Sequence, residues 1–326
     1  MPDIARIWGV ACDVNRCQGD HIHLLHSLLK QAIAELARPH PAGHSKVYVA
    51  IFRSGSNFMQ IIGLCRFSYP AYGGFQVEHE TVEDRIAFLY GEQRLEERFR
   101  LMETVALPCL KEQTDQDFEL IIVIGDSLPK RHFNRLHDLC ADIPQIRIHA
   151  EPPRRHRPVM KEILNAARRD PAQPCLQFRH DDDDAISVDF IERLRGSVSD
   201  CPGLIDKNRT VAFDFNRGYV AKVDAKGIAA VEVHQPYYVA SMGMYVEGGC
   251  RQTIMNFAHE KIHRFMPTVT ITDAPMFVRT HNGYNDSRQK SAKPLSVQPL
   301  TRELEGEFFA RFAMDSDHIR RTFSAA

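Results

Sequence analysis

The stretch that decides the fold is residues 119–126, which read ELIIVIGD. This short, β-branched and continuously apolar run is typical of a strand covered on both faces in a parallel sheet. A carboxylate, Asp126, stands at its C-terminal end. A second strand-like run, residues 175–179, leads in the same way into four aspartates, Asp181 to Asp184.

Helix and strand patterns alternate around these two runs. Helices are expected over residues 92–110, 130–140 and 159–169, and a further strand over residues 146–150. Such alternation with short connections predicts an α/β fold, a Rossmann-like mixed sheet with helices on both faces. Ligands of these sheets bind beyond the carboxyl ends of the strands, where Asp126 and the four aspartates are expected.

The chain divides into three parts in this interpretation. Residues 1–58 form an N-terminal extension that is not integral to the fold. Residues 59–290 form the main domain, with a nucleotide-sugar-binding half (59–200) and an acceptor half (201–290). Residues 291–326 form a C-terminal tail with one helix. The finer expectations in this region are a strand over residues 237–245, a helix over 252–265 and the tail helix over 300–312.

Composition excludes several classes of function. Lys and Arg number 41 against 42 Asp and Glu, so the net charge of -1 provides no global field for a nucleic acid. No apolar stretch approaches the roughly 20 residues of a membrane-spanning helix, and no secretory signal is found. The eight cysteines are scattered and are interpreted as reduced thiols. We therefore expect a cytoplasmic protein, with peripheral membrane association left open.

The aspartate run is the strongest functional signal. Four adjacent carboxylates repel one another and raise each other's pKa values unless a cation neutralises them. Mg²⁺ and Mn²⁺ take hard oxygen ligands, and Mg²⁺ sites commonly combine one or two carboxylates with substrate phosphates. The alternative is a solvated acidic loop that caps the following helix.

Two weaker signals stand at neighbouring strand ends. Arg154 and Arg155 belong to a basic loop after the strand at 146–150, and guanidinium groups match phosphate oxygens. A surface charge run is the more common explanation of such a loop. Asp126 is the second acidic site at the predicted sheet edge, and its alternative role is to cap the next turn.

Three motifs together resemble those of the rhamnosyltransferases, bacterial glycosyltransferases with the GT-A fold. They are QTDQDFELIIVIGD at 113–126, FRHDDDDAI at 178–186 and Arg279-Thr280-His281-Asn282. The resemblance covers about residues 59–287, and residues 1–58 depart from the family pattern.

The resemblance implies a nucleotide-sugar donor such as dTDP-L-rhamnose, with Mg²⁺ or Mn²⁺ bridging its diphosphate to the aspartates. It places Asp126 near the nucleoside and offers His281 as a late metal ligand, although His281 is equally an ordinary loop histidine. The residues expected to bind the donor are Arg66, Asp126, Arg154, Arg155, Arg179, Asp181 and Asp182, and those expected to bind the metal are Asp182, Asp183, Asp184 and His281.

The expected reaction is transfer of the sugar to a hydroxyl group of a glycan or polysaccharide, in which a carboxylate removes the acceptor proton. Glu247, Glu260 and Asp273 are the candidate bases, and each also has an ordinary surface interpretation. Two alternatives remain. A nucleotidyltransferase also uses paired aspartates and Mg²⁺, but residues 66–70 lack the Gly-rich, basic stretch it would need. A degenerate, non-catalytic transferase would act as a binding partner.

Overall fold

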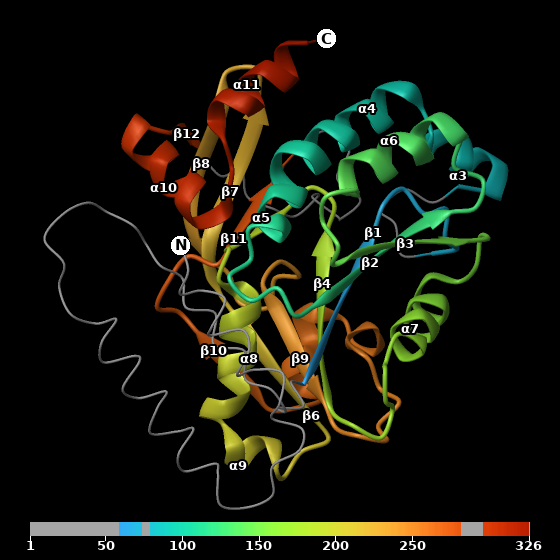
Figure 1. The fold of residues 1–326 in the computed structure, drawn as a ribbon, viewed down its shortest axis with the longest axis vertical. Coiled ribbons are helices and arrows are strands. Elements are labelled where there is room, and N and C mark those ends of the chain that lie inside the picture. The colour runs from blue at the N-terminus through green and yellow to red at the C-terminus, as the bar shows by residue number, and fades with distance from the viewer. Residues whose placement is uncertain (1–58, 74–78, 282–295, 326) are drawn as a thin grey trace, which may run out of the picture. The chain divides into compact units, whose positions relative to one another are not determined.

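A seven-stranded mixed sheet forms the centre of the computed structural model, which describes residues 59–73, 79–281 and 296–325 (Figure 1). The expected N-terminal extension, residues 1–58, lies outside these ranges. The strands follow the order β10-β6-β9-β4-β1-β2-β3. Their bounds are β1 Gln60–Arg66, β2 Glu119–Gly125, β3 Ile146–Glu151, β4 Cys175–Asp181, β6 Thr210–Phe215, β9 Met242–Val246 and β10 Thr268–Ile271.

Strand direction brings several carboxyl ends to one edge of this sheet. The strands β1, β2, β3 and β4 are parallel, whereas β9 runs antiparallel to both β4 and β6. Because two reversals restore the original direction, β6 and its parallel neighbour β10 also end at the edge where β1, β2 and β4 end. This edge is called the carboxyl edge below.

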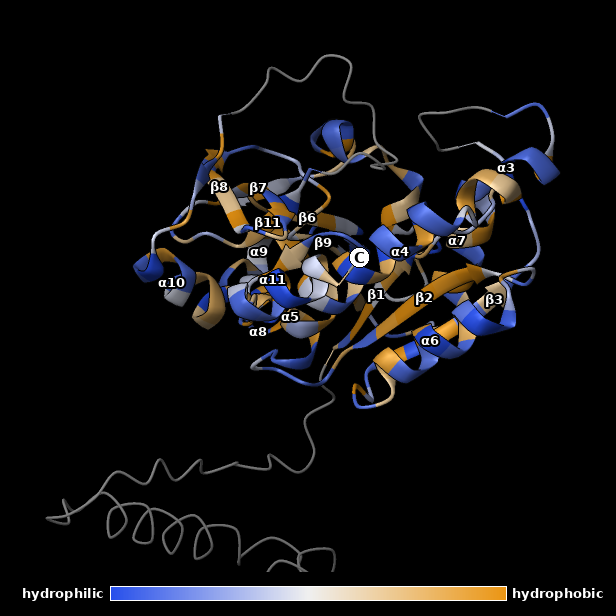
Figure 2. Ribbon diagram, turned by 90° about the horizontal axis from the view of Figure 1, so that it is seen from above, coloured by the Kyte–Doolittle hydropathy of each residue, from blue (hydrophilic) through white to orange (hydrophobic). Residues whose placement is uncertain are grey.

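Helices cover both faces of the sheet and enclose two apolar cores, as the hydropathy colours of Figure 2 show for the strands and the inner helix faces. The first core contains side chains of the helices that precede and follow β2 and of the helix after the aspartates. The second core lies on the other face. Helices on the first side are α4 Glu92–Leu101, the π-helical turn η2 Met102–Ala106, α5 Leu107–Lys111, α6 Lys130–Cys140, α8 Phe190–Asp200 and α9 Pro202–Ile205. Those of the second core are α7 His156–Ala166 and the 3-10 helices η3 Ile254–Asn256 and η4 His259–Arg264. One further helix, α3 Val82–Leu89, precedes α4.

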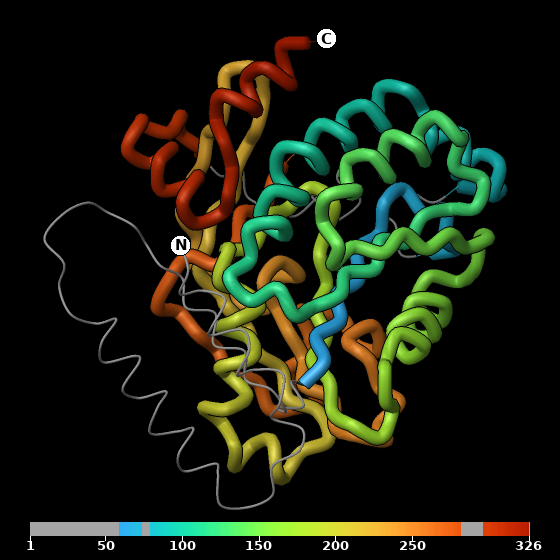
Figure 3. The backbone as a smooth tube through the Cα atoms, in the orientation of Figure 1, coloured from blue at the N-terminus to red at the C-terminus, as the bar shows by residue number. Residues whose placement is uncertain are grey.

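A smaller, five-stranded sheet follows the order β12-β8-β7-β11-β5. The hairpin of β7 and β8 is its centre, and the C-terminal helices lie beside this hairpin (Figure 3). The bounds are β5 Ala185–Ile186, β7 Arg217–Asp224, β8 Gly227–His234, β11 Phe277–Thr280, β12 Gln298–Pro299, α10 Arg302–Phe312 and α11 Ser316–Ser324.

The α/β fold class predicted from the sequence is confirmed, and β2 and α6 occupy the expected residues. The expectation of one helix in the C-terminal tail is wrong, because α11 follows α10. Asp315 caps α11 by accepting hydrogen bonds from the backbone of residues 317 and 318. Phe308 and Phe312 of α10 and Ile319 of α11 are buried in the first core, so this tail is part of the fold.

Two further expectations in the second half are corrected. The helix expected over 252–265 is two short 3-10 helices, because Phe257 and Ala258 have extended backbone conformations that separate them. The strand expected over 237–245 begins only at Met242. Tyr237 and Ser241 have positive φ angles of 61° and 60°, which interrupt an extended strand.

Gly63 lies in the middle of the central strand β1, where the adjacent side chains leave no room for a methyl group. A Cβ atom there would lie 2.3 Å from Cζ of Phe178 and 2.6 Å from Cδ1 of Leu120. Overpacking of this kind costs about 1–3 kcal/mol, so we expect Gly63→Ala to lower the free energy of unfolding in urea by that amount.

The matched control for this prediction is Gly196→Ala in α8, where a Cβ atom meets nothing within 4 Å. Because alanine is favoured over glycine inside a helix, this variant should gain roughly 0.5–1 kcal/mol. Equal stability of the two variants would show that the core around β1 adapts to the extra methyl group.

Candidate active site

The register of β1 and β4 sets two charged side chains side by side at the carboxyl edge. Arg66, the last residue of β1, pairs with Asp181, the last residue of β4. Because side chains alternate along a strand, Arg179 points to the same face as Asp181. This is the face of the second core, as the burial of Cys175 in that core shows.

Asp181 is surrounded by positive charge. Burial works against its charged form, but the charges of Arg179, Arg279, Arg66 and Arg98 outweigh burial and hold the pKa of Asp181 below its usual value. These arginines come from four different elements, β4, β11, β1 and α4. The carboxylate is therefore ionised at neutral pH and is the shared counter-charge of the four guanidinium groups.

The N-terminus of α7 adds to the same positive region. Burial, followed by the charges of Arg66, Arg179 and Arg157, lowers the pKa of His156 to about 2. The imidazole is therefore neutral at any physiological pH. Burial is the largest cause of this depression, and the three guanidinium groups add to it. Positive charge therefore gathers where β1, β4 and α7 meet, which favours an anionic ligand.

On the opposite face, Arg98 of α4 neutralises two of the aspartates. Its Nε donates to Oδ2 of Asp182 at 3.0 Å, and its Nη1 donates to Oδ2 of Asp183 at 3.0 Å. Its Nη2 donates to the other oxygen of Asp182. Arg98 and Asp182 are only 4% and 1% exposed. A guanidinium group therefore balances Asp182, and this contact competes with the metal-binding role expected for Asp182 from the sequence.

Asp184 stands next to Asp183, which Arg98 contacts through one carboxylate oxygen. Asp184 Oδ1 accepts the backbone N–H of Thr280 at 3.0 Å, and Thr280 Oγ1 donates to the carbonyl oxygen of Asp183 at 2.6 Å. Burial and the neighbouring charge of Asp183 raise the pKa of Asp184 well above its usual value, although Arg279 and the Thr280 N–H oppose this. Two buried carboxylates thus repel each other at the carboxyl edge.

The aspartate run is not a solvated acidic loop, because Asp182, Asp183 and Asp184 are 1%, 5% and 2% exposed. His281 follows β11, and its backbone N–H donates to the carbonyl oxygen of Ala221 at 2.8 Å. Within the described ranges, no three His, Cys, Asp or Glu side chains are grouped as a metal site. A divalent ion at Asp183 and Asp184 would therefore need oxygen atoms from a substrate, the arrangement common for Mg²⁺.

The remaining residues that were predicted to bind the nucleotide-sugar donor lie beside this region. Asp126 is exposed directly after β2. Arg154 forms ion pairs with Glu162 at 2.5 Å and Glu151 at 3.6 Å. Together with Arg155, Tyr72 and two prolines, Arg154 lines a pocket of about 630 Å³. The Tyr72 side chain is exposed in this pocket, and Arg155 directly precedes α7.

The three candidate bases do not meet at the site. Glu247 follows β9, whose end at Val246 pairs with Cys175 at the start of β4, so it lies at the opposite edge, roughly 20 Å from Asp181. Asp273 is ion-paired with Arg193 at 2.5 Å, and this hydrogen bond lowers the pKa of Asp273, which weakens it as a base. Glu260 is exposed on η4.

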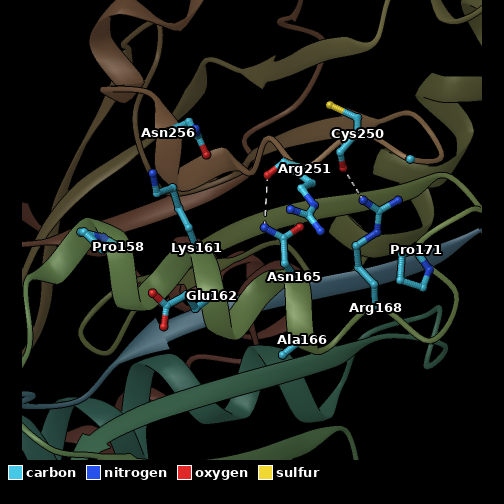
Figure 4. Close-up of a pocket in the computed structure, with 11 residues that line it drawn as sticks. Pro158, Lys161, Glu162, Asn165, Ala166, Arg168, Pro171, Cys250, Arg251 and Asn256 are labelled. Carbon is cyan, nitrogen blue, oxygen red and sulfur yellow. Dashed lines mark hydrogen bonds between the residues drawn. The ribbon is translucent and has the colours of Figure 1, made fainter.

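A larger groove extends along α7, with a volume of about 690 Å³ (Figure 4). Its wall is formed by α7 and by the segment between β9 and η3. Asn165 donates to the carbonyl oxygen of Arg251 at 3.1 Å, and Arg168 donates to that of Cys250 at 2.6 Å, which ties the two walls together. The lining residues are Pro158, Lys161, Glu162, Asn165, Ala166, Arg168, Pro171, Gly249, Cys250, Arg251 and Asn256.

Several site residues were not assigned from the sequence. Arg98, in a predicted helix far from the aspartates along the chain, carries no local signal at all. Arg279 belongs to the third motif, and His156 and Arg157 belong to the basic loop over residues 152–157, so their positions were signalled but their roles were not.

Comparison with known proteins assigns this chain to a family. The family model described as "Putative rhamnosyl transferase" matches residues 60–294. This chain belongs to that family. None of the curated proteins compared with this chain is similar to it.

Solved structures give only distant likenesses. S. aureus TarS 1-349 has 11% identity and a TM-score of 0.35, over 68% of this chain and 60% of that one. Its complex with UDP-GlcNAc has 12% identity and a TM-score of 0.37, over 73% and 62%. The chain described here thus spans about three fifths of the length of the TarS fragment. Helices in the described ranges are all too short or too polar to cross a membrane.

The contact of Arg98 with two buried aspartates predicts a large stability effect. In Arg98→Met the carboxylates lose their guanidinium partner while still buried, which should lower the free energy of unfolding by about 3–5 kcal/mol at pH 7. The loss should shrink as pH falls, because a buried carboxylate without its partner has a raised pKa and becomes neutral first. Denaturant titrations at several pH values measure both effects.

Arg100→Met on the same helix is the matched control. Arg100 forms an i,i+4 ion pair with Glu96 at 3.3 Å, and the Glu96 side chain is 39% exposed. Surface pairs of this kind contribute roughly 0–1 kcal/mol. If the two variants lose the same free energy of unfolding at pH 7, the contacts of Arg98 with the buried aspartates do not contribute more stability than a surface ion pair.

Proposed function

We propose that this protein transfers a glycosyl group from a nucleoside diphosphate sugar to a hydroxyl group of a glycan. The observation that carries this proposal is the positive region at the carboxyl edge, where Arg66, Arg157 and Arg179 surround the neutral His156. Planar guanidinium groups match the oxygen atoms of a diphosphate. A diphosphate is therefore the ligand group that this region suits best.

The nucleoside end of the donor would occupy the pocket beside Tyr72 and Arg155. An exposed aromatic ring offers a stacking surface for a base, and Asp126 stands at the end of the neighbouring strand β2. Arg154 is already paired with two glutamates, so Arg155 is the better candidate for a direct donor contact.

A divalent ion, Mn²⁺ or Mg²⁺, would be held by Asp183 and Asp184. The raised pKa of Asp184 supports this assignment, because a cation would remove the repulsion between the two carboxylates. When bound, the ion supplies Lewis-acid stabilisation of the departing diphosphate. The chain's own contribution is to orient both carboxylates through Thr280 and Arg98 and to provide positive charge from Arg179 on the other side.

L-rhamnose is the sugar that the family description supports, and dTDP is its proposed carrier. A glycan is the proposed acceptor, and the groove along α7 is its proposed place. Amide groups of Asn165 and Asn256 and the charges of Lys161 and Arg251 give this groove a polar lining suited to a polyhydroxylated chain. Its wall α7 also begins with His156, which connects the groove to the positive region.

Calorimetric titration with dTDP, with and without Mn²⁺, tests the donor site. We expect Mn²⁺ to tighten dTDP binding, and we expect this tightening to disappear in the double variant Asp183→Asn and Asp184→Asn. Arg179→Gln should weaken dTDP binding about 10- to 100-fold in either condition, because it removes a charged hydrogen-bond donor. Asp142→Asn is the control, since Asp142 is exposed and paired with Lys111.

Turnover separates the proposed function from its alternatives. Rhamnosyl transfer or hydrolysis of dTDP-L-rhamnose by the wild type supports the proposal. Formation of dTTP from dTDP-L-rhamnose and pyrophosphate would instead indicate a nucleotidyltransferase. Binding of neither dTDP nor Mn²⁺ would identify a non-catalytic protein, and a double variant with full Mn²⁺-dependent turnover would exclude the metal site.

A further inference from the structure

Of the three carboxylates expected to act as the base, Glu247 lies at the opposite edge, Asp273 is paired with Arg193, and Glu260 is exposed. The imidazole of the residue next to Glu260 is close to the carboxyl edge. His259 begins η4, whose Ile262 packs in the second core, on the face of the sheet that carries Arg179. Its side chain is 25% exposed. Arg179 and Asp181 both act on its pKa, so the ring lies within electrostatic reach of the carboxyl edge.

One hydrogen bond fixes the tautomer of this histidine. Nδ1 of His259 lies 2.5 Å from the carbonyl oxygen of Tyr237. A carbonyl oxygen can only accept, so Nδ1 carries the hydrogen. In the neutral ring the lone pair is then on Nε2. The carboxylate of Glu260 lies 3.9 Å from Nε2, which is beyond hydrogen-bond distance.

The Tyr237 carbonyl is itself held by several contacts. Tyr237 adopts the left-handed conformation with φ of 61°, and its N–H donates to Oδ1 of Asp214 at 2.9 Å. Its ring stacks on His263 of η4 at 4.6 Å. Asp214 lies near the carboxyl end of β6 and is 1% exposed. A strained residue persists only where its surroundings hold it, and such residues concentrate at functional sites.

The same loop also reaches the arginine cluster. The Tyr238 ring lies 5.0 Å from the guanidinium carbon of Arg279, which in turn acts on the pKa of Asp181 and Asp184. Ser241, with φ of 60°, closes the loop by donating to the carbonyl oxygen of Phe215 at 2.9 Å. The segment between β8 and β9 thus links His259 on one side to the proposed diphosphate site on the other.

We propose that His259 is the general base that removes the proton from the acceptor hydroxyl, with Tyr237 and Asp214 as positioning residues. This inference rests on the proposed function and assigns its missing base. As the acceptor oxygen forms a bond to the anomeric carbon, its O–H bond breaks and the proton passes to Nε2. The bond from the anomeric carbon to the diphosphate breaks in the same event, and the imidazolium later returns its proton to water.

The charged and polar groups that face His259 determine its pH behaviour. They are Arg179 and Asp181 from β4, the Tyr237 carbonyl from the β8–β9 loop and Glu260 of η4 itself. Burial and Arg179 lower the pKa of His259, and the other groups oppose them. The base form therefore predominates at neutral pH. The acidic limb of kcat/KM should lie below the usual histidine value of 6.5 and should vanish in His259→Gln.

The decisive experiment compares transfer to water with transfer to azide, using dTDP-L-rhamnose and the full chain. In His259→Ala, hydrolysis should fall about 10²- to 10⁴-fold, the usual contribution of a general base. Azide carries no proton, so formation of glycosyl azide should approach the wild-type rate. His137→Ala, on the exposed face of α6, is the control histidine and should keep both rates.

The outcomes separate the two proposals. A wild type that turns over the donor and a His259→Ala variant that hydrolyses it equally fast would overturn the assignment of the base alone. Loss of azide transfer together with hydrolysis would also overturn it, since His259 would then act in donor binding or folding. If the wild type shows no turnover, the proposed function fails. Nitrogen NMR of the labelled histidines still tests the inference in that case, because a hydrogen on Nε2 instead of Nδ1 contradicts it.

Discussion

Neutralisation of buried carboxylates by arginines is the constraint on which the rest of this structure depends. Residues Asp181 to Asp184 follow a buried strand, and charges removed from water must be compensated nearby. Arg98 from α4 neutralises Asp182 on the face of the first core. The charges of Arg66, Arg179 and Arg279 stabilise the ionised carboxylate of Asp181. These arginines belong to elements distant in sequence, so the site forms only when the helices and both sheets have packed.

This compensation is uneven, and the unevenness gives the site its chemistry. Positive potential predominates where β1, β4 and α7 meet, and two mutually repelling carboxylates remain at Asp183 and Asp184. An anion suits the first region and a cation the second. A metal-bound diphosphate unites both requirements in one ligand, which is why a nucleotide sugar is a better proposal for this edge than a simple anion.

The segment between β8 and β9 has a structural role that its sequence did not indicate. Its apolar and aromatic residues suggested a strand, yet Tyr237 and Ser241 take left-handed conformations. The resulting loop connects buried Asp214 to His259 by way of one backbone carbonyl. Proposed acceptor chemistry therefore depends on a loop conformation that is held by contacts from β6 and η4, not by local propensity.

The sequence by itself determined the elements whose hydrophobic pattern is strong and local, such as β2 and α6, and the end of β4 where the aspartates follow. It also carried enough of the three motifs to indicate the family. Tertiary structure alone decided which charges meet. Glu247 moved to the opposite edge because β9 runs antiparallel, and Asp182 became the partner of Arg98 because α4 packs over the strand end. Strand direction and helix packing are set by contacts between distant segments, and no local pattern records them.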